Sequence, residues 1–260
     1  MLNIDYLAHN NALKRVAASQ KLVISVSALL TVTILRNNSI ALWTLLFMSG
    51  VIVYYAKIPW KTFGKLMLAP LGFSIAGVLT ILASFSLSGE VPSNAMWAVT
   101  TEFVSLYILL SDGWRALNIF IVAFSATSCL YFLILTTPIY EISPILLKCK
   151  VPSIVVELME LTYRFIFIFF QTAEKIYTAQ HARLGYKNYR VSFQSLSLLI
   201  IALFQTIFFR YQTMTLAMKA RNIEQFILPQ IFLSQKNWQP KLIALYTGYI
   251  TGVLLLVIFY

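Results

Sequence analysis

Charged residues are scarce in this 260-residue chain. Only 11% of its residues are Asp, Glu, Lys or Arg, whereas 59% are hydrophobic. An average soluble domain carries roughly a quarter charged residues, so charges this sparse cannot cover a water-exposed surface. The composition therefore excludes an ordinary soluble domain and indicates an integral membrane protein.

Residue types that serve catalysis and metal binding are also few. The two cysteines, Cys129 and Cys149, and the two histidines, His9 and His181, match neither a disulfide framework nor a metal-site spacing. No G-x-x-x-x-G-K-[ST] motif is present, so the chain is not expected to hydrolyse ATP by itself. No nucleophile and base form a recognisable pair. We predict a chain that is not an enzyme and holds no catalytic residue, cofactor or metal of its own.

What the sequence has in abundance is apolar runs. A spanning helix needs about 20 mostly apolar residues, and five runs approach that length: 17–35, 39–56, 66–87, 116–136 and 242–259. Residues 95–115 are ambiguous between a spanning, a re-entrant and an interfacial segment, because Glu102 and Asp112 disfavour contact with lipid. Lys21 is expected to extend towards the lipid headgroups. The start of the chain lacks a basic region followed directly by an apolar core, so no cleaved signal peptide is expected.

The basic residues predict the orientation of the chain. All but Arg36 and Arg115 of the 20 lysines and arginines fall on one side of these five spans. Positive charge stays in the cytoplasm, which predicts a multi-pass protein of a prokaryotic inner membrane with its N-terminus inside. The predicted organisation is a membrane domain of four spans over 1–137, a cytoplasmic segment over 138–241 and a final span over 242–260. The predicted fold class is all-α.

The cytoplasmic segment is predicted to form two long helices. The first runs from Ser153, its N-terminal cap, to about Arg183, with Gly185 as a C-terminal stop. The second runs from about Ser192 to Arg221, and its apolar run is judged too short and too interrupted to span a membrane.

Three sets of residues stand out in these helices. Each helix finishes in an Ala-Arg pair, Ala182-Arg183 in the first and Ala220-Arg221 in the second. Glu160 and Arg164 are four residues apart with the acid first, the favoured order for a helix-surface pair, so they are expected to give structural support. Composition alone favours the interpretation that the arginines at the helix ends are ordinary positive-inside residues.

Several stretches together resemble one family. They are IDYLAHNNALKRV, AKIPW, LTTPIYEI, KVPSIVVELMELTYRFIFIF, AEKIYTAQHARLGY and LAMKARN. The chain resembles the transmembrane T component of energy-coupling factor (ECF) transporters, specifically the cobalt-type CbiQ group. In that family two Ala-Arg-Gly-like motifs end cytoplasmic coupling helices that dock into two ATPase subunits. The resemblance places these motifs at Ala182, Arg183 and Gly185, and at Ala220 and Arg221, with Asn222 where the family has glycine.

The resemblance also implies partners and a substrate. Two ATP-binding cassette subunits would hold ATP and Mg, and a separate substrate-binding membrane S component would select cobalt for cobalamin biosynthesis. Membrane lipid is a further expected partner, and nucleic acid is not. The alternatives are a nickel or vitamin importer of the same type, a stand-alone secondary carrier, which would carry ionisable residues inside its spans, and a membrane enzyme.

Overall fold

The computed structural model describes residues 3–82, 84–86, 95–101, 104–221 and 238–258. These residues form two compact units. One contains the described residues of 2–138 and 235–260, and we call it the bundle unit. The other contains those of 139–234, and we call it the hairpin unit.

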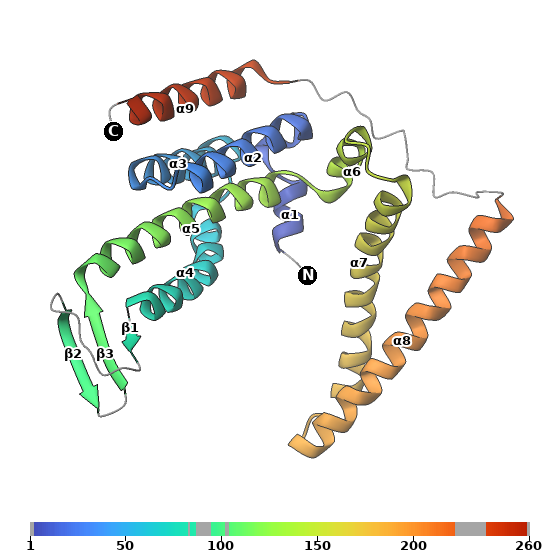
Figure 1. Ribbon diagram of the computed structural model, residues 1–260. Coiled ribbons are helices and arrows are strands. Elements are labelled where there is room, and N and C mark those ends of the chain that lie inside the picture. Colours follow the sequence, from blue (N-terminus) through green and yellow to red (C-terminus); the bar gives the residue numbers. More distant parts are fainter. Residues whose placement is uncertain (1–2, 83, 87–94, 102–103, 222–237, 259–260) are drawn as a thin grey trace. The chain divides into compact units, whose positions relative to one another are not determined.

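The bundle unit is built around one central helix, α5 (Leu110–Thr136). Helices α2, α3 and α4 all contact α5, and α9 contacts α3 (Figure 1). Fully buried side chains, including Ile52, Phe132 and Tyr249, form its core. The other elements of this unit are the helices α1 (Asn3–His9), α2 (Ala18–Leu35), α3 (Asn38–Gly50), α4 (Trp60–Leu82) and α9 (Pro240–Ile258), the 3₁₀ turn η1 (Ala12–Arg15) and the π-helical turn η2 (Val51–Tyr55).

A small sheet accompanies these helices. Strands β1 (Ser84–Ser86), β2 (Ala95–Thr101) and β3 (Val104–Leu109) are antiparallel in the order β1-β3-β2, with Val99 paired to Leu106. The prediction of a helical membrane protein is confirmed, but it did not anticipate these strands, and the third predicted span ends at Leu82 instead of residue 87. The segment 95–109 is rich in β-branched and aromatic residues, which favour strands.

Six described helices are long and apolar enough to cross a membrane, judged by length and composition only. Five of them lie over the predicted runs: α2, α3 continued by η2, α4, α5 from Gly113, and α9. The sixth is α8 (Tyr189–Ala220) of the hairpin unit. The prediction that the apolar run of α8 is too short to span is therefore wrong on length, because the continuous helix has 32 residues.

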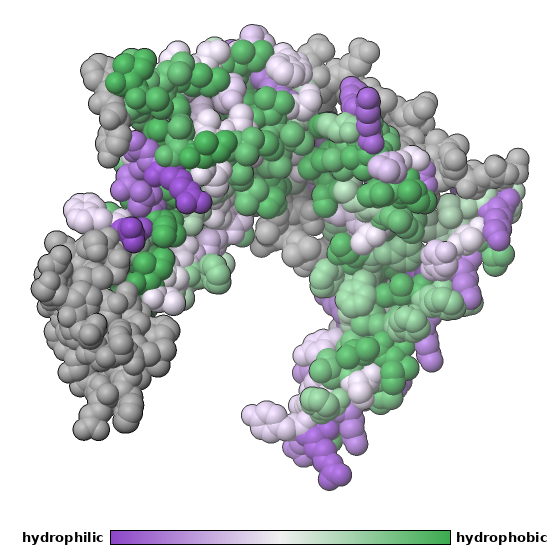
Figure 2. Space-filling view, in the orientation of Figure 1, coloured by the Kyte–Doolittle hydropathy of each residue, from purple (hydrophilic) through white to green (hydrophobic). Residues whose placement is uncertain are grey.

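The hairpin unit consists of α6 (Ile139–Lys148), α7 (Ser153–Ala182) and α8. Helices α7 and α8 are joined at residues 183–188 and diverge from that turn (Figure 1). An apolar hollow of about 250 Å³ lies between them, lined by Leu161, Phe165, Phe204, Ile207, Phe208 and Tyr211. Hydrophobic side chains cover the middle of the unit, and hydrophilic ones gather at both ends of α8 (Figure 2).

The two long helices match the predicted ones, except in the cap of the first and the start of the second. Helix α7 begins at Ser153, but its cap is Pro152 and no side chain caps the first turn, so the predicted Ser153 cap is wrong. Helix α8 begins at Tyr189, three residues before the predicted Ser192. Both helices end at the alanine of an Ala-Arg pair.

Candidate functional site

The end of α7 is a Schellman motif centred on Arg183. Arg183 is the C-terminal cap (φ −93°, ψ 14°), and Leu184 follows with a left-handed φ of 60°. The Leu184 amide donates to His181 O (3.0 Å) and the Gly185 amide donates to Gln180 O (2.9 Å), which are the two bonds of that motif. Leu184, and not Gly185, therefore takes the left-handed position that usually favours glycine.

Gly185 is needed for a different reason than the sequence suggested. A Cβ atom at this position would lie 2.7 Å from Ser195 Oγ and 2.9 Å from Gln180 O. The close approach follows from two bonds already present, because Ser195 Oγ donates to Gly185 O (2.7 Å) while Gln180 O accepts from the Gly185 amide. Gly185 thus lets the turn lie against the first turns of α8.

Four residues that sequence reasoning missed hold this turn together. The Gln180 side chain donates from Nε2 to Ser195 O (3.0 Å) and accepts from the Tyr186 hydroxyl at Oε1 (2.8 Å). The Tyr186 ring packs on Tyr177, with ring centroids 4.8 Å apart. Gln180 and Tyr186 flank the Ala-Arg pair in the stretch AQHARLGY, so their position beside a helix end is the signal that could have identified them.

Arg221 repeats the backbone conformation of Arg183 at the end of α8. Its φ of −92° and ψ of 5° nearly equal those of Arg183, and its amide donates to Met218 O (3.1 Å). Asn222, which follows it, lies outside the described residues. The two Ala-Arg pairs therefore share a local conformation as well as a sequence.

The structure does not bring the two arginines together. Arg183 stands at the turn before α8 and Arg221 at the far end of α8. At about 1.5 Å per residue, the 32 residues of α8 extend about 48 Å. Both side chains are exposed, and within the described part of the chain neither guanidinium group has a hydrogen-bond or ion-pair partner. They are two separate exposed cations, each of which could bind a different surface.

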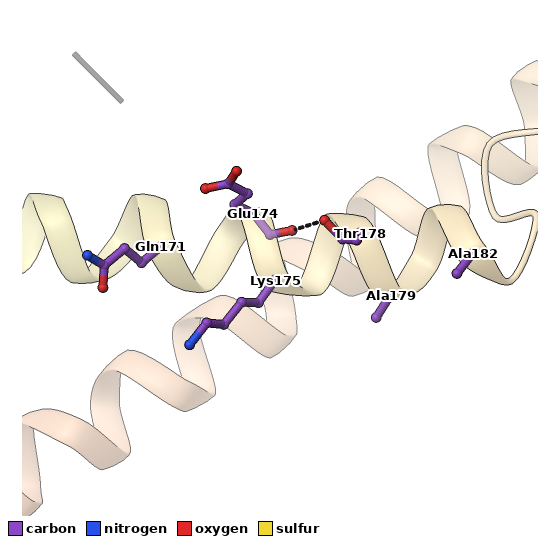
Figure 3. Close-up of a pocket in the computed structure, with 6 residues that line it drawn as sticks. All are labelled: Gln171, Glu174, Lys175, Thr178, Ala179 and Ala182. Carbon is purple, nitrogen blue, oxygen red and sulfur yellow. Dashed lines mark hydrogen bonds between the residues drawn. The ribbon is translucent and has the colours of Figure 1, made fainter. Parts of the chain in front are cut away.

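A shallow hollow of mixed polar and apolar lining runs along α7 to the first Ala-Arg pair. Gln171, Lys175, Ala179 and Ala182 follow each other at helical spacing on one side of α7 (Figure 3). With Glu174 and Thr178 they line an open hollow beside the helix. Because Ala179 and Ala182 are both exposed and small, a partner surface can approach the helix backbone closely just before Arg183.

The pair proposed for structural support is present on α7 but is not an ion pair. Glu160 is half-buried and Arg164 is exposed, and no contact within 4.0 Å joins their charged groups among the described residues. The supporting role of these two residues remains a prediction.

Metal ligands do not cluster in the described ranges. No group of three His, Cys, Asp or Glu residues lies close enough there to hold a metal ion.

Comparison with known proteins identifies the family. Residues 9–230 match the family model of the cobalt transport protein CbiQ. The chain belongs to the CbiQ family. It is thus a membrane protein of a cobalt transport family, which agrees with a chain that is not itself an enzyme.

The relatives of this CbiQ-family chain have low sequence identity, but they align with most of its length. CbiQ of Salmonella typhimurium is 26% identical over 215 residues, 83% of this chain and 94% of that protein. An uncharacterised protein of Methanocaldococcus jannaschii is 28% identical over 220 residues, 84% of this chain and 79% of the relative. A putative fused cobalt transport protein, CbiMQ, of Methanocorpusculum labreanum is 31% identical over 207 residues, which are 75% of this chain and 32% of the fused protein.

Proposed function

We propose that this CbiQ-family chain is the energy-coupling T component of an ATP-driven ECF-type importer. In this role Arg183 and Arg221 dock into two cytoplasmic ATPase subunits, one arginine in each. When the ATPases close on ATP and separate after hydrolysis, α7 and α8 follow them. A separate membrane S component binds the ion, and this chain transmits the movement to it. ATP and Mg belong to the ATPases.

The observation that carries the proposal is the matched pair of helix ends. Two exposed arginines share the same C-terminal cap conformation, Arg183 at the end of α7 and Arg221 at the end of α8, and the intervening α8 is about 48 Å long. Two copies of one ATPase would need two equivalent docking points on one asymmetric chain, and such a repeat supplies them. An arginine offers five donors in a rigid fork, which suits a carboxylate or a row of backbone carbonyls in a groove.

The fused relative supports the existence of a membrane partner. The CbiMQ protein matches this chain over only 32% of its length, so its remaining part is a different segment joined to a CbiQ-like one. We infer that the corresponding partner is a separate S component here. Cobalt is the proposed ion, with nickel as the alternative, and a competition assay for uptake of Co²⁺ and Ni²⁺ by the whole complex separates the two.

The test of the coupling role is a substitution of each arginine with a matched control. Hydrogen bonds to a charged group contribute about 1.5–3 kcal/mol each, so Arg183→Ala or Arg221→Ala should weaken ATPase binding about 10- to 150-fold. Arg190→Ala and Lys219→Ala, which remove exposed cations close to the same helix ends, should leave binding near the native level. The measurements are co-purification with the ATPase subunits in mild detergent and ATP hydrolysis by the recovered complex.

The outcome can also contradict the proposal. Full ATPase recovery and coupled import by the Arg183→Ala, Arg221→Ala double variant would refute the docking role. A chain that transports Co²⁺ when reconstituted alone would instead establish a secondary carrier.

A further inference from the structure

The C-terminal end of α5 is held by side chains from the start of the chain. The last carbonyls of a helix lack partners within the helix, and in α5 the Leu133 carbonyl accepts from the Thr137 amide (2.9 Å). Pro138 has no N–H to donate, so the helix cannot continue and its last carbonyls need donors from elsewhere. In an apolar surrounding such unpaired groups are costly.

Lys21 supplies the strongest of these donors. Its side chain is fully buried, and Nζ donates to Thr136 O at 2.7 Å. The prediction that Lys21 extends to the lipid headgroups is therefore wrong, because its Nζ is bound to the C-terminal end of α5 inside the bundle unit. A positive charge is also favourable beside the carbonyl end of a helix dipole.

Asn11 adds a second connection to the same helix end. Its side chain is 8% exposed, and Nδ2 lies 3.3 Å from Leu135 O and 3.4 Å from Thr136 O. The same nitrogen makes its two shorter bonds within α1, to Leu7 O (3.1 Å) and Ala8 O (2.7 Å). Asn11 thus joins α1 to α5, while Lys21 joins α2 to α5.

This helix end is also where the chain leaves the bundle unit. Residue 138 is the last of the bundle unit before α6, and the hairpin unit begins at residue 139. Thr136 and Thr137 are both buried, so the point of departure is fixed in the interior of the bundle unit. A force that the hairpin unit exerts along this connection passes through Pro138 and Thr137 to the Thr136 backbone.

We propose that Lys21 and Asn11 form a clamp on the last carbonyls of α5 and make this point the fixed pivot through which movement of the hairpin unit enters the bundle unit. The functional half of this statement rests on the proposed coupling role. Lys21 and Asn11 are positioning residues in this scheme, and neither needs to contact an ion or an ATPase. The clamp itself does not depend on any partner, so it can be tested on this chain alone.

Gln20 provides a matched control for Lys21. It precedes Lys21 on α2, is 2% exposed, and also binds backbone with its side chain. Its Nε2 donates to Gln239 O (3.2 Å) and its Oε1 accepts from the Gln239 amide (3.0 Å), so it connects α2 to the segment before α9 and not to α5. Lys21→Met and Gln20→Met each remove one buried polar group from neighbouring positions, but only the first removes a bond to α5.

The first experiment measures the pivot directly. Spin labels are placed on the exposed native Cys149, just after α6, and on Trp60→Cys at the exposed start of α4. Distance distributions are recorded on the full chain in lipid nanodiscs. We expect Lys21→Met to broaden the distribution relative to that of the native chain, and Gln20→Met to leave it at the native width. If Lys21→Met fails to fold, Asn11→Ala is the second variant, and it should also broaden the distance distribution. Equal widths in all variants, or equal broadening by Gln20→Met, would overturn the clamp.

The second experiment measures the consequence for transport. In the complete complex with its ATPases and S component, Lys21→Met should keep ATP hydrolysis while the amount of Co²⁺ imported per ATP falls, because movement of the hairpin unit no longer reaches the bundle unit through a fixed point. Loss of ATPase binding without a change in the distance distribution would overturn the pivot role. Should the arginine variants show that no ATPase docks on this chain, the coupling proposal fails, whereas the distance measurement still decides the clamp.

Discussion

Gly185 gives the sharpest test of how the α7–α8 turn is built. A Cβ at position 185 would meet Ser195 Oγ at 2.7 Å and Gln180 O at 2.9 Å. The serine side chain could rotate away, but it would then lose its bond to Gly185 O while remaining 8% exposed. The Gln180 carbonyl is backbone, and it also accepts the Gly185 amide, so it cannot move without breaking the Schellman motif.

These contacts set the expected size of the effect. Overpacking of a fitted site costs about 1–3 kcal/mol. The gain from Gly→Ala in the unfolded chain, about 0.4–1 kcal/mol, offsets only part of that cost. Gly185→Ala should therefore destabilise the closed turn by about 1–2 kcal/mol, which corresponds to hydrogen exchange roughly 5- to 30-fold faster at the amides of positions 184 and 185.

Hydrogen exchange followed by mass spectrometry on the chain in detergent measures this directly. Gly64→Ala in α4 is the matched control, because nothing lies within 4 Å of a Cβ there, and it should leave exchange in the turn unchanged. Adding Ser195→Ala to Gly185→Ala removes the contact with Oγ but leaves the contact with the Gln180 carbonyl, so recovery should be partial. Native exchange rates in Gly185→Ala would refute the account of this turn.

Two further predictions concern the same helices. Leu184→Gly should slow hydrogen exchange in the turn slightly. Removing the left-handed φ of 60° from a leucine stabilises the turn by about 1–2 kcal/mol, whereas the greater entropy of glycine in the unfolded chain costs about 0.5–1 kcal/mol. Faster exchange would show that the exposed Leu184 side chain contributes more to the turn than its φ costs. A second prediction places both ends of α8 on the cytoplasmic side. In the Cys149→Ser background, the exposed positions 187 and 219 are replaced in turn by Lys187→Cys and Lys219→Cys. Both thiols should react with a membrane-impermeant reagent from the cytoplasmic side only, whereas labelling from opposite sides would show that α8 crosses the membrane.

Periodicity and composition predict much of the fold because long apolar runs leave few alternatives. The spans over α2, α3, α5 and α9 were predictable because each must present about 20 apolar residues to lipid. The sheet was not, because a short segment rich in β-branched residues carries the same hydropathy as a helix of that length.

In the candidate site, too, some features could be predicted from the sequence and others could not. Both Ala-Arg pairs are visible in the sequence, because a helix without Pro or Gly that finishes in a basic residue has a recognisable end. The contacts of Gln180 with Ser195 and of Lys21 with Thr136 join residues 15 and 115 positions apart. No local sequence pattern specifies contacts between residues so far apart in the chain. A lysine at the start of an apolar run is therefore predicted to extend to the lipid headgroups unless its tertiary partner is known.

The length and hydropathy of α8 would by themselves allow it to cross a membrane, and the arginines argue against that. A crossing α8 would place Arg183 and Arg221 on opposite sides, with Lys187 and Arg190 accompanying the first and Lys219 the second. One of these basic groups would then face the exterior, against the tendency of positive charge to stay inside. An α8 that lies along the inner face of the membrane keeps both groups in the cytoplasm and leaves its exposed apolar side chains, such as Phe204 and Phe209, to contact lipid or a membrane partner. Under the proposed coupling role, the same apolar surface that suggests a span would hold both arginines of α8's two ends at the membrane.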